Sequence, residues 1–546
     1  METKWKTASS LEKILFHNFD EVPEQSCGSM MKNEIYSFQL VGYMYDKLEY
    51  GVDFKFEIES ELLPYIKVYN VDYVPNRLPT IEVEDDDDYI TKEPGFFPDP
   101  LHINKDNIIN IPNKNTRAVW ITVEPNSEIS GTFPINIKIF GKENELCAER
   151  VYTLKVIDAC LPKQRLLNTG WFHGDCIATL HNVEIGSEKY YEIVEKYLDV
   201  YVKFGHNMII TPIFTPPLDT DEGGERPTNQ LIGVKVLSDG YEFDFTKLDH
   251  WIDVCQKHGI EKFEMAHLFT QWGAKHAPKI MAEKDGRTER IFGWDTDSAG
   301  EEYTGFLEAM LPKLMEFLKA KGVFENCLFH ISDEPNKDHQ EQYGKVRMVM
   351  TRFIPENQLM DALGLYDFYE KGLVKKPVVS INHIHNFIEK GVKNLWAYYC
   401  MAQRGEVSNR FLAMPSYRNR ILGYQLYKYN IEGFLQWGFN FWFGVRSRCV
   451  IDPYIDTTAN GGFPGGDAFV VYPLNADGEV VCSNRLYVFN ESLQDLRALE
   501  LLESLTDRET VLSLIEDVKD FRVYPRNNEY ILSLREKVNK MIEERI

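Results

Sequence analysis

Two neighbouring acids, Asp333 and Glu334, follow an apolar segment in the stretch "CLFHISDEPNKD". In such a pair one carboxyl group can hold a proton while the other is ionised, so the pair can combine proton transfer with stabilisation of positive charge. The same letters also fit the first turn of a helix in a surface loop, where Ser, Asp, Glu and Pro are common. The elements that carry the pair decide between these two interpretations.

The region from 161 to 505 alternates short apolar segments with longer amphipathic ones. The amphipathic segments, such as "FTKLDHWIDVCQKHG" and "EYTGFLEAMLPKLMEFLKAKG", close on a glycine, as helices often do. Eight strand-helix units predict a (β/α)8 barrel of the TIM type, and a doubly wound sheet is the alternative. The expected strands are "LLNTGWFHGD", "HNMIITPIF", "KFEMAHLF", "CLFHISDEP", "QLMDALGLYD", "PVVSINHI", "NLWAYYCM" and "GFLQWGFNFW".

Active sites of such barrels lie at the C-terminal ends of the strands. Asp333 and Glu334 end the fourth predicted strand, so the barrel favours a catalytic role for them over a helix start. Other polar and aromatic residues are expected to form a substrate-binding cup around the pair; Asp361 and Trp272 are also at strand ends. The binding residues that we predict are Trp171, His173, Asp175, Asn207, His267, Asn382, Tyr398, Tyr399, Trp437, Trp442 and Asp467. For the histidines and tryptophans among them the alternative is a place in the core.

The cup contains carboxylates, amides and flat rings but few cations, and the chain has neither a Walker sequence nor GxGxxG, which disfavours phosphorylated substrates. A metal hydrolase would draw on His173, Asp175, His206, His267 and His330, but no HxH or HExxH accompanies the HxD of "FHGD". A serine or cysteine hydrolase would need a nucleophile elbow, and GxSxG is absent. Paired acids with aromatic platforms fit glycoside hydrolysis best.

Adjacent acids do not fit the ordinary two-carboxylate mechanism, because retaining glycosidases hold two carboxyl groups about 5 Å apart on opposite sides of the anomeric carbon. A sugar with a 2-acetamido group removes this difficulty, since its own carbonyl oxygen can attack that carbon. Asp333 would then hold the acetamido N–H and stabilise the positive charge, while Glu334 would protonate the leaving oxygen. The pair therefore predicts substrate-assisted hydrolysis.

Residues 1–160 show a different pattern, with short segments such as "VDFKFEIES" and "INIKIFG" in which apolar and polar residues alternate. This period of two predicts an antiparallel β-sandwich. Residues 506–546 are expected to form a helical or irregular extension packed on the barrel. The acidic run from Asp85 to Asp88 fits no EF-hand spacing, so we expect a solvated loop there, with calcium binding as the alternative.

Composition limits the partners. The 546 residues include 84 acidic and 60 basic ones, and the net charge of −24 argues against nucleic acid and anionic membrane surfaces. No segment approaches the roughly 18 apolar residues of a membrane span. The N-terminal stretch lacks a signal-peptide pattern, so we expect a cytoplasmic protein, or a secreted one if a signal peptide has been trimmed.

The pair in "HISDEP" resembles the catalytic pair of glycoside hydrolase family 123, the β-N-acetylgalactosaminidases, and its order is similar to that of the family 20 hexosaminidases. "FFPDPL" and "WITVEPNSEISGTFPINI" resemble the N-terminal domain of family 123. "GFLQWGFNFW", "GGDAFVVYP" and "SNRLYVFNESLQDLRALELLE" resemble the end of its barrel and the closing helix. The resemblance covers nearly the whole chain.

The resemblance implies a retaining exo-glycosidase that removes terminal β-linked N-acetylgalactosamine from glycosphingolipid-type oligosaccharides through an oxazolinium intermediate, with no metal or cofactor. Asp333 would orient the acetamido group and Glu334 would be the general acid/base. A tyrosine, Tyr398 or Tyr399, would hold the acetamido carbonyl. The alternatives are a catalytically silent carbohydrate-binding barrel and a β-N-acetylglucosaminidase of similar mechanism.

Overall fold

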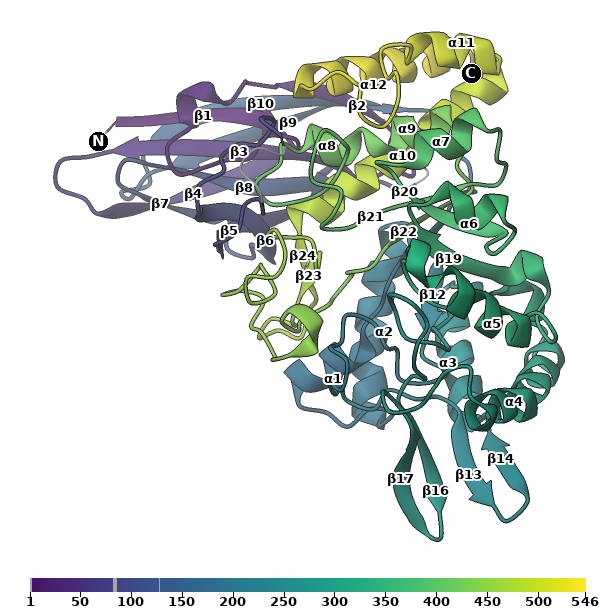
Figure 1. Ribbon diagram of the computed structural model, residues 1–546. Coiled ribbons are helices and arrows are strands. Elements are labelled where there is room, and N and C mark those ends of the chain that lie inside the picture. Colours follow the sequence, from purple (N-terminus) through teal and green to yellow (C-terminus); the bar gives the residue numbers. More distant parts are fainter. Residues whose placement is uncertain (1, 82–85, 127) are drawn as a thin grey trace.

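The computed structural model describes residues 2–81, 86–126 and 128–546. An N-terminal β-sandwich lies beside a closed barrel of eight parallel strands with helices around it (Figure 1). The predicted fold class is confirmed.

The sandwich consists of two sheets with the strand orders β1-β3-β8-β5-β6-β24-β23 and β2-β10-β9-β4-β7, antiparallel except for the β2–β10 pair. Phe56 of β4 pairs with Ile139 of β9, and both are fully buried, as is Phe54. The alternation of the sequence therefore sets the buried face of each strand. The N-terminal strands are β1 (Glu2–Ser9), β2 (Cys27–Met31), β3 (Tyr36–Tyr45), β4 (Gly51–Glu59), β5 (Ile66–Asn76), β6 (Gly95–Ile103), β7 (Ile108–Pro112), β8 (Asn115–Val123), β9 (Gly131–Phe140) and β10 (Leu146–Ile157).

The barrel contains all eight predicted strands. They follow one another around the barrel in the same order as in the sequence. These strands are β11 (Leu167–Gly170), β12 (Met208–Thr211), β15 (Lys262–Met265), β18 (Cys327–His330), β19 (Leu359–Leu363), β20 (Lys376–Ser380), β21 (Trp396–Tyr399) and β22 (Gly433–Gln436).

Helices follow the barrel strands, and Gly259 and Gly322 end α3 and α4 with φ of +90° and +78°, angles that glycine adopts without strain. None of the described helices is long and apolar enough to cross a bilayer. The helices of this part are α1 (Gly174–His181), α2 (Glu188–Lys203), α3 (Thr246–Lys257), α4 (Glu301–Ala320), α5 (Gln340–Met350), α6 (Tyr366–Glu370), α7 (Ile384–Glu389), α8 (Tyr417–Arg420), α9 (Leu422–Lys428) and α10 (Asn484–Leu505).

Two short strands that follow the barrel, β23 (Val471–Tyr472) and β24 (Val481–Ser483), join the first sheet of the sandwich through the pairing of β24 with β6. A buried ion pair of 2.7 Å between Arg485 of α10 and Asp99 of β6 reinforces this junction. The sandwich is thus built from segments far apart in the sequence, and it extends beyond the boundary predicted at residue 160.

The C-terminal segment contains α11 (Arg508–Leu514) and α12 (Asn528–Glu543). Arg535 of α12 forms an ion pair of 2.7 Å with Asp495 of α10, and Asn539 donates to the backbone carbonyl of Ser29 in β2 at 3.1 Å. This extension therefore packs on α10 and on the sandwich as well (Figure 1).

Two hairpins inserted in the loops after β12 and β15 form a separate four-stranded sheet with the order β14-β13-β16-β17. Figure 1 shows this sheet projecting from the barrel, away from the sandwich. Its strands are β13 (Gly233–Leu237), β14 (Gly240–Asp244), β16 (Ile280–Lys284) and β17 (Arg287–Phe292).

The acidic run is not simply a solvated loop, contrary to the sequence prediction. Asp85 lies outside the described residues, but Asp86 is buried and lies 2.8 Å from Arg418 and 3.3 Å from Arg526. Because Arg418 itself is fully buried, Asp86 supplies the charge that this guanidinium needs in the interior. Asp86 of the predicted loop therefore serves as a counter-ion.

Candidate active site

A pocket of about 170 Å³ lies at the C-terminal ends of the barrel strands. It contains Asp333 and Glu334, as expected for residues at the C-terminal end of a barrel strand. Loops after β12, β15, β18, β21 and β22 contribute its walls. The lining residues are Trp171, Leu218, Asp219, Gln271, Trp272, Asp333, Glu334, Ala362, Tyr398, Cys400, Met401, Ala402, Leu435, Trp437 and Phe463.

The turn that carries the pair is strained. Glu334 has φ of +44°, a left-handed conformation that costs a residue with a side chain about 1 kcal/mol or more. Its backbone N–H donates to the carbonyl of Ala362 at 3.1 Å, and the carbonyl of Asp333 accepts from the N–H of Trp272 at 2.9 Å. Neighbouring strand ends thus hold both acids over the pocket, and such stored strain is typical of functional sites.

The two carboxyl groups differ in their partners. Glu334 accepts a hydrogen bond of 2.7 Å from the hydroxyl of Tyr398. Among the described residues, none donates a hydrogen bond to the Asp333 carboxylate, which is half-buried in the pocket wall. Burial and the neighbouring Glu334 raise the pKa of Asp333 well above its usual range, so Asp333 keeps its proton to a higher pH than an ordinary aspartate does.

Tyr398 and Tyr399 are consecutive residues of β21, so their side chains point to opposite faces of the strand. Tyr398 lines the pocket, whereas Tyr399 is fully buried and packs against Phe434 with ring centroids 5.0 Å apart. Tyr398 is therefore the tyrosine available to a ligand, and Tyr399 is a core residue, which corrects its predicted role.

Aromatic rings form much of the pocket wall. Trp437 donates from Nε1 to the carboxylate of Asp467 at 3.0 Å and packs edge-on against Phe463. Asp467 is fully buried behind Trp437, and burial raises its pKa to about 7. Trp272, which also lines the pocket, is 42% exposed, with the Arg446 guanidinium over its ring. The exposed ring is thus a ready platform for a sugar face.

Three predicted binding residues lie behind the pocket and hold its walls. His173 contacts the backbone carbonyl of Trp437 through Nε2 at 2.9 Å, and burial and Arg226 lower its pKa to about 4. Asp175 forms a buried ion pair of 2.9 Å with Arg226. Asn382, after β20, accepts from Gln403 at 3.0 Å. None of the three lines the pocket.

Asn207 precedes β12 and lies at the opposite end of the barrel. Its side chain accepts from the N–H of Asn168 at 2.8 Å and donates to the carbonyl of Leu166 at 2.9 Å, so it joins two strand starts. This position leaves it no access to the pocket and corrects the prediction. A residue near a strand reaches the cup only if it lies at the C-terminal end.

A polar network lies inside the barrel beneath the pocket. Glu264 of β15 accepts from Trp171 Nε1 at 2.6 Å and from Thr169 at 2.7 Å, and it also contacts His330 Nε2 at 2.5 Å. His330 Nδ1 lies 3.2 Å from Asp361 Oδ1. Sequence analysis missed the role of Glu264, although a charged residue inside an apolar strand was a signal for it.

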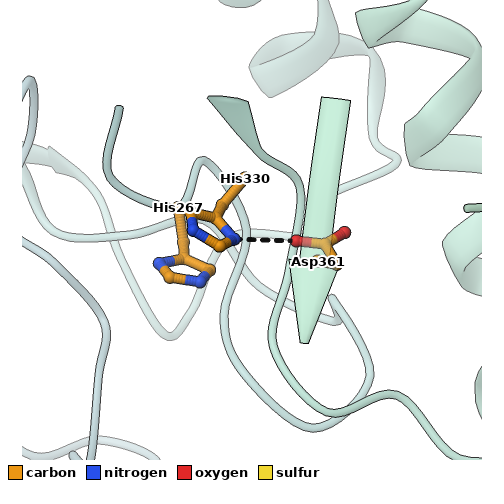
Figure 2. Close-up of side chains that lie close together, drawn as sticks. All are labelled: His267, His330 and Asp361. Carbon is orange, nitrogen blue, oxygen red and sulfur yellow. Dashed lines mark hydrogen bonds and ion pairs between the residues drawn. The ribbon is translucent and has the colours of Figure 1, made fainter. Parts of the chain in front are cut away.

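One group of described residues, His267, His330 and Asp361, has ligand atoms close enough to be considered for a metal ion. The rings of His267 and His330 stack with centroids 4.2 Å apart and an interplanar angle of 21° (Figure 2). Lone pairs in nearly parallel ring planes do not converge on one ion, and both nitrogens of His330 already contact carboxylates. His330 and Asp361 belong to the hydrogen-bonded network beneath the pocket, whereas His267 stacks on His330 and neither of its ring nitrogens has a hydrogen-bond partner among the described residues.

Other pocket residues had no local signal in the sequence. Asp219 and Phe463 come from long loops, and Gln271 accepts from the backbone N–H of Asp219 at 2.8 Å. Burial raises the pKa of Asp219 to about 6. These loops meet only because the strands before them are neighbours in the barrel.

The tryptophans provide a first test. Trp442 is fully buried and its Nε1 donates to the carbonyl of Val471, so it is a core residue and not the predicted platform. Trp442→Ala should cost about 3–5 kcal/mol of stability. Trp272→Ala should leave the melting temperature near that of the wild type but raise KM about fivefold, because stacking is worth ~1 kcal/mol. The reverse pattern, measured by thermal melting and steady-state kinetics, would exclude Trp272 as a platform.

Comparisons with known proteins agree with this architecture. The family model described as "Glycoside hydrolase 123, catalytic domain" matches residues 171–502. Among solved structures, a family 123 glycoside hydrolase from Clostridium perfringens is similar, with 16% identity, a TM-score of 0.78, and coverage of 100% of this chain and 98% of that chain. A search of curated proteins found no match.

Two further structures are similar at TM-scores too low to carry an argument. They are a β-glucuronidase from Parabacteroides merdae (12% identity, TM-score 0.33, 90% of this chain and 51% of that chain) and an endo-β-1,4-mannanase from Thermotoga petrophila (12% identity, TM-score 0.34, 61% and 77%). The family model by contrast spans more than half of the chain and includes Asp333 and Glu334. The protein therefore belongs to glycoside hydrolase family 123.

Proposed function

We propose that the protein is a retaining exo-glycosidase that removes terminal β-linked N-acetylgalactosamine by substrate-assisted catalysis. The observation that carries this proposal is the adjacent pair itself: Asp333 has a free carboxylate in the pocket, while Glu334 is held by Tyr398. Neighbouring residues on one turn cannot flank an anomeric carbon from both sides, so the nucleophile has to come from the substrate.

In the first step the acetamido oxygen attacks the anomeric carbon and the bond to the leaving oxygen breaks. Glu334 gives its proton to that oxygen. Asp333 accepts the acetamido N–H and stabilises the positive charge of the oxazolinium ring. In the second step water attacks the same carbon, Glu334 takes the proton of the water, and the ring opens to the sugar with its original configuration.

The pair shares one proton, and the ligand determines which acid holds it. An acetamido N–H donated to Asp333 favours the ionised form of that acid, which leaves the proton on Glu334 where the leaving oxygen needs it. The Tyr398 hydroxyl, which donates to Glu334 at 2.7 Å, is then free to turn to the acetamido carbonyl. The same hydroxyl can thus contact either the acid or the substrate.

The substrate class rests on family membership and on the Clostridium perfringens relative, whose structure is described in terms of glycolipid glycan hydrolysis. We therefore propose a glycosphingolipid-type oligosaccharide with a terminal β-linked N-acetylgalactosamine. The pocket is lined by loops from several strand ends, and its small volume of about 170 Å³ favours a chain end over an internal residue.

Hydrolysis of aryl β-GalNAc, aryl β-GlcNAc and aryl β-galactoside tests the proposal. We expect turnover of the GalNAc substrate, slower turnover of the GlcNAc substrate, and none of the galactoside, because the galactoside lacks the internal nucleophile. Faster turnover of the GlcNAc substrate would make the protein a β-N-acetylglucosaminidase. Binding of these sugars without turnover of any of them would instead establish a silent carbohydrate-binding barrel.

A further inference from the structure

His330 is the last residue of β18 and lies three positions before Asp333. It is fully buried and contacts Glu264 through Nε2 at 2.5 Å and Asp361 through Nδ1 at 3.2 Å. Ionised carboxylates only accept hydrogen bonds, so a ring held between two of them donates from both nitrogens and carries a positive charge.

Each of the two carboxylates has further donors that support its ionised form. Glu264 also accepts from Trp171 and Thr169. Asp361 accepts from the hydroxyl of Tyr343 and from two backbone N–H groups of the segment after β18. Burial opposes a charge on His330, but its hydrogen bonds to Asp361 and Glu264 raise its pKa to about 10. The ring is therefore an imidazolium at neutral pH.

The same network fixes the chain that leads to the catalytic pair. The N–H groups of Ile331 and Ser332 donate to Asp361 Oδ1 at 3.0 and 3.2 Å, and the hydroxyl of Ser332 donates to the carbonyl of Thr270 at 2.8 Å. A strained conformation such as that of Glu334 persists only where its surroundings over-determine it. These bonds supply that constraint on the strand side of the turn.

We infer that His330 is a positioning residue: as an imidazolium clamped between Glu264 and Asp361, it orders the strand end that leads to the catalytic pair and places a positive charge behind Asp333. The inference rests on the proposed function, because the proposed substrate-assisted hydrolysis requires Asp333 as an anion. His330 itself touches neither the substrate nor the leaving group.

The charges around Asp333 explain why a cation is needed there. The charged groups with the largest effect on it are Glu334 on its own turn, Glu264 of β15, Asp361 of β19 and His330 of β18. Three of these four groups are acids, and a negative charge on any of them disfavours the ionisation of Asp333. The hydroxyl of Tyr398 and the thiol of Cys400, from the β21 side, also face the pair and carry no positive charge. His330 is thus the one cation among these four groups.

The test is the pH dependence of kcat/KM for aryl β-GalNAc in His330→Gln. Ionised Asp333 is required, so activity rises with pH as this acid loses its proton. Loss of the imidazolium removes a charge that lowers the pKa of Asp333. The acid limb of the profile, where kcat/KM rises with pH, should therefore move to higher pH by about 1 unit. A folded variant with an unchanged acid limb would overturn the inference.

His206→Gln is the matched control. His206 is also a buried barrel histidine, but burial lowers its pKa to about 3, and its Nδ1 contacts the backbone carbonyl of Tyr201. This substitution removes a neutral ring, so it should lower stability without moving the acid limb. A similar shift in both variants would mean that the effect of His330→Gln is structural, which also contradicts the inference.

A measurement on the wild type does not depend on the folding of a variant. In protein labelled with ¹³C and ¹⁵N at histidine, the His330 ring should show two protonated nitrogens from neutral pH to about pH 9. A neutral ring at pH 7 would overturn the inference whatever the kinetics show. Failure of the wild type to hydrolyse any aryl glycoside would instead remove the proposed function, and the NMR spectrum separates the two failures.

Discussion

Glu334→Gln is expected to reduce hydrolysis of a natural β-GalNAc oligosaccharide by about 10²- to 10⁴-fold, the usual contribution of general acid catalysis. Glutamine keeps the size of the side chain and can still contact Tyr398, but it has no proton to give to a sugar leaving group. An aryl glycoside with a good leaving group needs that proton less. Its rate should therefore fall by a much smaller factor in the same variant.

The measurement is kcat/KM for both substrates in wild type and variant. Glu341→Gln is a suitable control, since Glu341 is an exposed acid of α5 that pairs with Lys345. It should have wild-type rates on both substrates. Equal losses on the two substrates in Glu334→Gln would show that Glu334 does not protonate the leaving oxygen.

Asp333→Asn is expected to lower kcat by about 10²- to 10³-fold, equivalent to roughly 3–4 kcal/mol and comparable to the removal of an oxyanion-hole donor. Asparagine cannot stabilise the positive charge of the oxazolinium ring. A thiazoline analogue of the bicyclic intermediate should inhibit the wild type more strongly than GalNAc does, because it resembles the transition state. The same analogue should lose most of this advantage in Asp333→Asn.

Proton NMR of the first-formed sugar checks the stereochemistry of the same mechanism. We expect the β anomer, since two displacements at one carbon restore the configuration. Initial release of the α anomer, or a sugar ester trapped on an enzyme carboxylate, would contradict substrate assistance. The acid to examine would then be Asp219, because it lines the pocket while Asp175 and Asp361 are held in buried hydrogen bonds.

Much of the fold could be predicted from the sequence because its signals are local. The alternation in β4 and β9 reflects side chains that point to opposite faces of a strand, and glycines after α3 and α4 adopt positive φ. Repeated strand-helix units predict the barrel, and the barrel in turn puts the end of each strand at one rim. The position of Asp333 and Glu334 at this rim followed from their place at the end of the fourth strand.

Other features depended on contacts between distant segments. Asn207 seemed to belong to the cup, but β12 begins one residue later, and its amide joins the starts of two strands. Trp442 and Tyr399 have the residue types of sugar platforms, yet both are packed in the core. A tryptophan or tyrosine looks the same in the sequence whether it lies in the pocket or in the core, and only the packing distinguishes the two positions.

The sequence by itself determined the elements, their order, and the two acids at a strand end. Tertiary structure alone decided which side chains surround those acids: Tyr398 on Glu334, the loop residue Asp219 in the wall, and the Glu264–His330–Asp361 network below. The physical reason is that periodicity arises from neighbours along the chain. The composition of a barrel pocket arises from strand closure, which brings together residues up to a few hundred positions apart.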